Sequence, residues 1–382
     1  MNSRMKSLVL AILAYSMLLS SCSQAAKTSQ DAIYRGDLQR TGVYDVQPVK
    51  QLNGVLWKFQ TGGEVWSSPV EAGGLVFFGS DDNFFYAVDA RTGQEKWRFE
   101  TGDDVRSSPT VVGGIVYFRS FDQYIYALKA TNGELAWKVS LKEFEDENLA
   151  VREQYDDFLS SPLVANGLVY TGNYVNLYAL DASTGQEKWR LKVLSAQRSI
   201  PTLANGILYF GAFDNLYAMD AQTGQEKWKF KCMSVPYAPA VKDGILYFAS
   251  KDTYLYALDA LSGELKWKNN LSGGSWVTSS PAVWEGMVYA GTSDGRALFA
   301  VHLENGETAW QFPSHGYVWG SPSLAGGVVY FGSGNKNFYA MDAKSGQELW
   351  HFETGGPVYS TPWIAEGVVY FGSNDGFVYA LH

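Results

Sequence analysis

The chain has 382 residues, of which 39 are acidic and 30 basic, so its formal net charge is −9 at pH 7. This acidic balance argues against nucleic-acid binding, which depends on a basic footprint. Aromatic residues make up 15% of the chain and glycine contributes 39 residues, a composition that suits many short strands joined by turns.

Residues 1–21 have the pattern of a targeting segment. Arg4 and Lys6 supply a positively charged start, and the apolar run Leu8–Leu19 follows it. A run of this length is too short for a transmembrane helix, which needs about 20 residues, but it suits a signal peptide. We therefore expect residues 1–21 to be a signal peptide, and the residues at its end indicate that it is a lipoprotein signal peptide.

The end of this segment, Leu19–Cys22 (LSSC), resembles the lipobox of bacterial lipoproteins. The resemblance implies cleavage before Cys22 and lipidation of its thiol, and several acyl chains anchor a protein stably to a bilayer. Ser23 rather than Asp after the cysteine favours the outer membrane, facing the periplasm or the surface. The alternative is a cysteine that merely lies near an ordinary cleavage site, where small residues are also common.

Residues 22–52 follow as a polar stretch that we expect to be a lipid-anchored tether. The stretch contains Tyr34–Gly42 (YRGDLQRTG), whose local composition is typical of turns.

The rest of the chain is organised around Ala87–Trp97 (AVDARTGQEKW), which has the form A-x-D-x-x-T-G-x-x-x-W. The motif recurs, intact or slightly altered, six more times, and an isolated tryptophan precedes the first copy. The eight tryptophans lie 39 to 52 residues apart: Trp57, Trp97, Trp137, Trp189, Trp228, Trp267, Trp310 and Trp350. A fixed period near 40 residues indicates a repeat architecture.

One repeat predicts four short strands. In Ser67–Phe99 the segments SSPV, LVFF, FYAVDA and EKWRF are separated by turn residues, as in a propeller blade. Thr361–His382 supplies only three strands, and the segment around Trp57 supplies one. We therefore predict an all-β, eight-bladed β-propeller over residues 53–382, closed by the N-terminal strand joining the C-terminal blade, which leaves no exposed sheet edge at the ends and favours a monomer.

Three residues of the motif have physical roles in this prediction. Gly93 permits the positive φ of a tight turn, and Asp89 can accept hydrogen bonds from backbone N–H groups of that turn. Trp97 lies on the outermost strand, where its side chain can cover the seam between neighbouring blades. We assign the eight tryptophans this structural docking role.

An insertion of about 12 residues interrupts the period between Trp137 and Trp189. It falls around Lys142–Phe158 and carries seven acidic residues. Charge runs usually face water, so a solvated inter-blade loop is favoured. The alternative is a lip over one face of the ring that touches a ligand or partner.

The tryptophan motif resembles the docking motif of the quinoprotein (PQQ-like) repeat propellers, and Tyr34–Gly42 resembles a segment found just before many of them. The resemblance covers the chain from Trp57 to the end. Members of this family include PQQ-dependent alcohol and glucose dehydrogenases. They also include the BamB lipoproteins, non-catalytic scaffolds of outer-membrane protein assembly. The resemblance therefore implies the fold and leaves two kinds of function open.

Several residue patterns favour a scaffold over an enzyme. The PQQ alcohol dehydrogenases carry two adjacent cysteines beside the quinone, whereas the only cysteines here are Cys22 and Cys232. The four histidines show no metal-ligand spacing, and we assign no catalytic or metal-binding residue. The expected function is a membrane-anchored scaffold that binds envelope or outer-membrane proteins. The alternatives are a dehydrogenase that binds PQQ with Ca²⁺ and a surface lipoprotein that binds carbohydrate or peptide.

One constellation suggests a binding site. The residue three positions before each corner proline of the innermost strands should ring the mouth of the central funnel. Arginines among aromatic rings suit a flat anionic ligand, such as PQQ or an acidic or aromatic peptide. The alternative is that these side chains only fill the channel. The candidate ligand- or partner-binding residues are Trp66, Arg106, Arg198, Trp319 and Tyr359.

Overall fold

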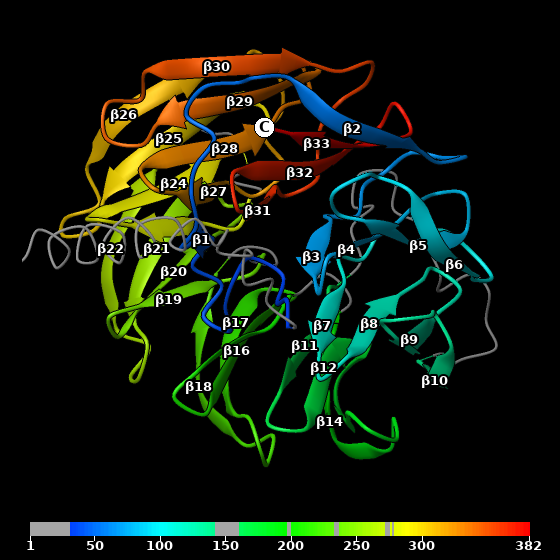
Figure 1. The fold of residues 1–382 in the computed structure, drawn as a ribbon. Helices are drawn as coiled ribbons and strands as arrows, with labels where there is room; N and C mark the ends of the chain where they lie inside the picture. Colours follow the sequence, from blue (N-terminus) through cyan, green and yellow to red (C-terminus); the bar gives the residue numbers. More distant parts are fainter. Residues whose placement is uncertain (1–30, 142–159, 197–199, 233–236, 272–275, 277–278) are drawn as a thin grey trace, which may run out of the picture.

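The computed structural model describes residues 31–141, 160–196, 200–232, 237–271, 276 and 279–382. These residues form eight sheets arranged as a closed ring, and the four strands of each blade pair in antiparallel fashion (Figure 1). The first blade contains β3 (Val70–Ala72), β4 (Leu75–Gly79), β5 (Phe84–Asp89) and β6 (Glu95–Glu100), ordered from the axis outward. The predicted all-β, eight-bladed propeller is confirmed.

The next six blades repeat this order. Blades two to four are β7 (Thr110–Val112), β8 (Ile115–Arg119), β9 (Tyr124–Lys129), β10 (Leu135–Ser140); β11 (Leu163–Ala165), β12 (Leu168–Gly172), β13 (Asn176–Asp181), β14 (Glu187–Lys192); β15 (Thr202–Ala204), β16 (Ile207–Ala212), β17 (Asn215–Asp220), β18 (Glu226–Lys231). Blades five to seven are β19 (Ala240–Lys242), β20 (Ile245–Ala249), β21 (Tyr254–Asp259), β22 (Leu265–Asn270); β23 (Ala282–Trp284), β24 (Met287–Gly291), β25 (Ala297–His302), β26 (Thr308–Pro313); β27 (Ser323–Ala325), β28 (Val328–Gly332), β29 (Asn337–Asp342), β30 (Glu348–Glu353).

The eighth blade joins the two ends of the chain. It contains β31 (Trp363–Ala365), β32 (Val368–Ser373) and β33 (Phe377–Leu381), and β2 (Val55–Gln60) is its outer strand. In Figure 1 the blue β2 lies beside the red β33, and Trp57 pairs with Ala380 in the antiparallel register. The predicted closure, three C-terminal strands plus one N-terminal strand, is confirmed.

The tryptophans of the repeat lie on the seams between blades. The indole nitrogen of Trp97 donates a hydrogen bond of 3.0 Å to the carbonyl of Ala130 in the next blade. A Cβ added at Gly133 would lie 2.6 Å from the Trp97 ring, so only glycine fits beneath the indole. Six other indole nitrogens likewise donate a hydrogen bond to a backbone carbonyl of the following blade, those of Trp57, Trp137, Trp189, Trp228, Trp267 and Trp310.

The closing seam uses a different partner. Trp350 donates to the carbonyl of Val49, at 2.9 Å, because the eighth blade has no copy of the motif turn. The hydroxyl of Tyr330 bonds to the same residue, 2.7 Å from its nitrogen and 3.1 Å from its oxygen. The chain before β2 thus supplies the docking surface that a turn supplies elsewhere.

Residues 31–49, which belong to the stretch expected to be a lipid-anchored tether, are packed into the ring. β1 (Val43–Tyr44) pairs with β27 in parallel, and backbone hydrogen bonds join the segment to the inner strands of five blades. The hydrogen-bonded residues of these strands are Val111, Leu203, Val241, Val283 and Leu324. We call residues 31–49 the axial plug. The sequence did not reveal it because its turn-like composition shows no strand pattern.

The axial plug enters from the face opposite the funnel mouth. The carboxylate of Asp31 accepts a hydrogen bond from Gly113, in the turn between the two inner strands of blade two. Tyr34 lies at the axis, where its hydroxyl is 2.8 Å from the hydroxyl of Thr361. The chain then returns along β27 toward Val49.

Candidate functional site at the funnel mouth

The structure brings four of the five predicted binding residues together. Trp66, Arg106, Trp319 and Tyr359 all line one axial cavity. Arg198 lies outside the described residues, as do Cys22, the signal segment and the insertion Lys142–Phe158. Among the described residues no helix has the length and apolar character needed to cross a bilayer.

Four aromatic rings at the mouth form a continuous stack. The ring centroids are 5.0 Å apart for Trp66 and Tyr359, 4.6 Å for Tyr359 and Trp319, and 5.2 Å for Trp319 and Tyr317. We call these four residues the aromatic stack. Tyr317 was missed at the sequence level, although it lies only two positions before Trp319 in the same corner. The four rings therefore pack on one another at the mouth.

A guanidinium group flanks each end of the aromatic stack. Arg106 lies 4.9 Å from the Trp66 ring, and Arg296 lies 5.4 Å from the Tyr317 ring. Such contacts stabilise a cation over an aromatic face. The pattern of arginines among aromatic rings predicted from sequence is therefore present, with Arg296 as a further member.

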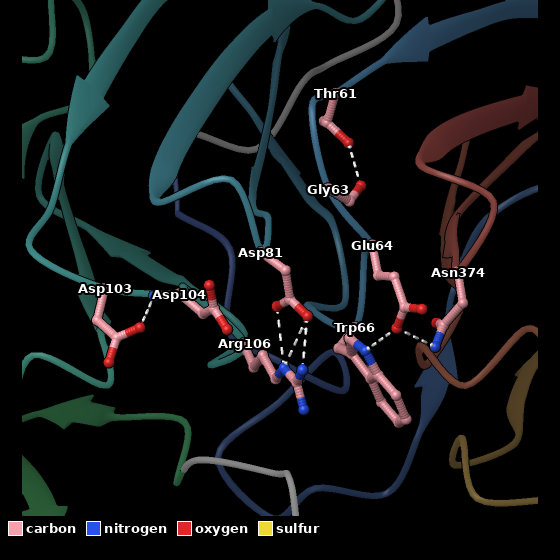
Figure 2. A network of polar contacts seen from close by, with 9 residues as sticks. All are labelled: Thr61, Gly63, Glu64, Trp66, Asp81, Asp103, Asp104, Arg106 and Asn374. Carbon is pink, nitrogen blue, oxygen red and sulfur yellow. Dashed lines mark hydrogen bonds and ion pairs between the residues drawn. The ribbon is translucent and has the colours of Figure 1, made fainter.

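Arg106 is committed to an ion pair that the sequence did not reveal. Its guanidinium donates to both carboxylate oxygens of Asp81, with a shortest distance of 2.6 Å (Figure 2). Both side chains are only 12% exposed, and burial raises the pKa of Asp81 to about 6 although Arg106 opposes the shift. The charge of Arg106 is thus balanced at neutral pH, which weakens its predicted role as an anion ligand.

Carboxylates also surround this side of the mouth. Glu64 accepts hydrogen bonds from the indole of Trp66, at 2.8 Å, and from Asn374, at 2.9 Å (Figure 2). Asp103 and Asp104 lie on the loop that precedes Arg106. The local charge is therefore acidic and suits a neutral or basic partner better than the anionic one expected from sequence.

The space beneath the aromatic stack is small. The cavity has a volume of about 40 Å³, and Tyr34 of the axial plug contributes to its lining. Binding pockets for cofactors are usually about 300–1,000 Å³, so the described residues do not form a slot for a flat tricyclic quinone. Cys232 is buried, and burial raises the pKa of its thiol to about 12. Within the described ranges no three His, Cys, Asp or Glu side chains cluster as metal ligands.

Large apolar side chains are exposed on the same face as the mouth. Tyr174 and Phe213 occupy turns between the second and third strands of blades three and four, and are 44% and 56% exposed. Leu194 follows β14 next to Tyr174, and Trp276 precedes blade six. We call Tyr174, Leu194, Phe213 and Trp276 the mouth-face residues. Exposed aromatic side chains of this size are typical of protein-binding surfaces.

A closed ring of eight four-stranded blades with docking tryptophans on its seams defines a quinoprotein-type β-propeller. A family profile described as outer membrane protein assembly factor BamB matches residues 45–198, 122–241, 212–318 and 299–382. Because these matches extend from residue 45 to the C-terminus, the chain belongs to the BamB-like family.

Solved structures support the fold. BamB from Moraxella catarrhalis is similar with a TM-score of 0.70 and 18% identity, over 86% of this chain and 97% of that one. Quinohemoprotein alcohol dehydrogenase from Comamonas testosteroni gives 0.75 and 17%, over 94% and 81%. The alcohol dehydrogenase ADHIIG from Pseudomonas putida HK5 gives 0.76 and 15%, over 93% and 80%. No curated protein matches in sequence. At these identities the likeness concerns the fold.

Proposed function

We propose that the protein is a non-catalytic scaffold of the bacterial envelope that binds partner proteins through its mouth face and takes part in outer-membrane protein assembly. One observation carries this proposal. The axis is occupied by the chain's own axial plug and by mutually stacked rings, whereas large apolar side chains are exposed around the mouth. A binding surface on the face, rather than a chamber at the axis, fits that distribution. Membership of the BamB-like family supports the same reading.

The position of the axial plug supports an orientation for this scaffold. Asp31 lies on the face opposite the mouth, and it is the ninth residue after Cys22. Nine extended residues reach at most about 30 Å. A lipid on Cys22 would therefore hold the opposite face near the bilayer and direct the mouth face away from it, toward other envelope proteins.

A second reading has a specific observation in its favour. The aromatic stack, with Trp319 and Tyr317 partly exposed, offers flat apolar surface to a carbohydrate or a peptide.

The likeness to quinohemoprotein and methanol dehydrogenases keeps PQQ binding, with Ca²⁺, as the enzymatic alternative. The small size of the axial cavity counts against PQQ binding, and a titration of the protein with PQQ tests it.

Replacement of a mouth-face residue tests the scaffold. We expect Phe213→Glu to reduce recovery of the β-barrel assembly machinery from detergent-solubilised membranes by tenfold or more, because a central aromatic contact contributes about 2 kcal/mol to binding. Leu261→Glu is the matched control, since Leu261 is 75% exposed in a motif turn on the opposite face. Equal recovery by the wild type and both variants would contradict a mouth-face interface.

A further inference from the structure

The turns after the second strand of four blades share one residue and differ in the residue before it. The shared residue is an aspartate that accepts a hydrogen bond from the hydroxyl of the tyrosine four positions later: Asp82, Asp122, Asp252 and Asp375. The residue before this aspartate is, in the same order, Asp81, Phe121, Lys251 and Asn374. Shared residues maintain the blade fold, so a residue that varies can give one blade a role of its own.

In blade one this varying residue binds Arg106. The two carboxylate oxygens of Asp81 accept three hydrogen bonds of 2.6 to 3.1 Å from the guanidinium group. Among the described residues, Arg106 is the only hydrogen-bond partner of the Asp81 side chain. The carboxylate of Asp82 instead accepts hydrogen bonds from the backbone of Gly62 and Phe84. The Asp81 carboxylate therefore serves the arginine, whereas Asp82 holds the turn.

The surroundings of Arg106 are those of a carboxylate-binding site. Its guanidinium lies 4.9 Å from the Trp66 ring and 5.7 Å from the Phe121 ring, so two aromatic side chains border it. A bidentate pair with a planar carboxylate is the arrangement in which arginine recognises acidic ligands. Here the carboxylate in that arrangement belongs to Asp81 of the chain itself (Figure 2).

The two charges of this pair depend on each other. Burial raises the pKa of Asp81, and the carboxylates of Asp104 and Glu64 raise it further, whereas Arg106 lowers it. The ionised form of Asp81 is therefore maintained by the arginine. Loss of the Asp81 carboxylate would in turn leave Arg106, whose side chain is only 12% exposed, as a largely buried cation without this counterion. Such a charge favours another anion in the vacated position.

We infer that Asp81 is a specificity-determining residue of the funnel mouth, because its carboxylate occupies the position in which Arg106 would bind the carboxylate of a ligand. Acidic groups are thereby excluded from this side of the mouth, and a partner presents neutral or basic groups to it. This consequence for the partner rests on the function proposed above. The occupied position itself does not, and it can be tested without a partner protein.

Formate tests the occupied position, because Asp81→Ala removes a carboxyl group of the same size. Formate should raise the melting temperature of the Asp81→Ala protein saturably relative to chloride at equal ionic strength. It should not do so for the wild type, in which Asp81 already fills the position. We expect the double variant Asp81→Ala/Arg106→Gln to raise the half-saturating formate concentration by about tenfold or more, the effect of losing a charged hydrogen-bond donor.

Glu187→Ala is the matched control, because Glu187 also forms a bidentate pair, at 2.6 and 2.8 Å, with an arginine. That arginine, Arg190, is 51% exposed, and exposed pairs contribute little, so this variant should show no saturable response to formate. Asp81→Ser repeats the test if Asp81→Ala does not fold.

Two results would overturn the inference. One is an equal formate response of the Asp81→Ala protein and the wild type, and the other is an equal response of Asp81→Ala and the double variant. Neither result involves a partner protein, so failure here is distinguishable from failure of the scaffold proposal, which the Phe213→Glu variant tests.

Discussion

Replacing Trp350 with alanine is expected to lower the free energy of unfolding by about 3–5 kcal/mol, the usual cost of truncating a buried tryptophan. Trp350 is 8% exposed and closes the ring by donating to the carbonyl of Val49. The variant loses this hydrogen bond and leaves a cavity on the seam between blade seven and the axial plug. Urea unfolding followed by tryptophan fluorescence and circular dichroism measures the change.

The control for this prediction is Trp276→Ala. Trp276 is exposed on the mouth face, and surface substitutions usually change stability by no more than about 0.5 kcal/mol. If the two alanine variants unfold at the same urea concentration, the seam is not what holds the closing blade.

Replacing Gly133 with alanine is expected to cost about 2–5 kcal/mol. The residue has a φ of 71°, where an L side chain costs about 1–2 kcal/mol. The new Cβ would also lie 2.6 Å from the Trp97 ring, and overpacking of this kind costs about 1–3 kcal/mol. The measurement is the free energy of unfolding in denaturant.

Gly113→Ala separates the two contributions. Gly113 has a similar φ of 60°, but no atom lies within 4 Å of an added Cβ. Its substitution should show only the backbone cost of about 1–2 kcal/mol. A loss at Gly133 no larger than that at Gly113 would show that the tryptophan does not need the glycine beneath it.

The repeat made the fold predictable from sequence because each blade carries the same local pattern. The outer strands, such as β6, expose every second residue while Trp97 is buried, and the period of two is visible in the sequence. The closing blade was predictable because Trp57 had no strands before it and Thr361–His382 had no fourth strand after it. Both patterns are local, and the ring follows from their repetition.

The axial plug was not predictable in this way. The hydrophilic side chains of Arg35 and Arg40 would be expected on the surface. They are fully buried instead, because backbone carbonyls of distant blades accept hydrogen bonds from their guanidinium groups. Such partners depend on the tertiary arrangement and leave no pattern near residue 35.

The structure brings four of the five candidate binding residues together, and their binding role stays a prediction. Trp66, Arg106, Trp319 and Tyr359 line one cavity, since equivalent positions of a ring converge at its axis. The partner of Arg106 was missed because Asp81 lies in the turn between β4 and β5 rather than in a corner. Asp81 balances the charge of Arg106, and the nearby carboxylates of Glu64, Asp103 and Asp104 then make a neutral or basic ligand more suitable than the anionic one expected from sequence.

The measurement that tests the account most directly is a calorimetric titration of the protein with PQQ, in the presence and absence of Ca²⁺. Among the described residues, the axial plug and the aromatic stack leave only a small cavity at the axis. We therefore predict no saturable heat and an unchanged melting temperature. Saturable one-to-one binding with a raised melting temperature would contradict this prediction and would favour a quinoprotein dehydrogenase.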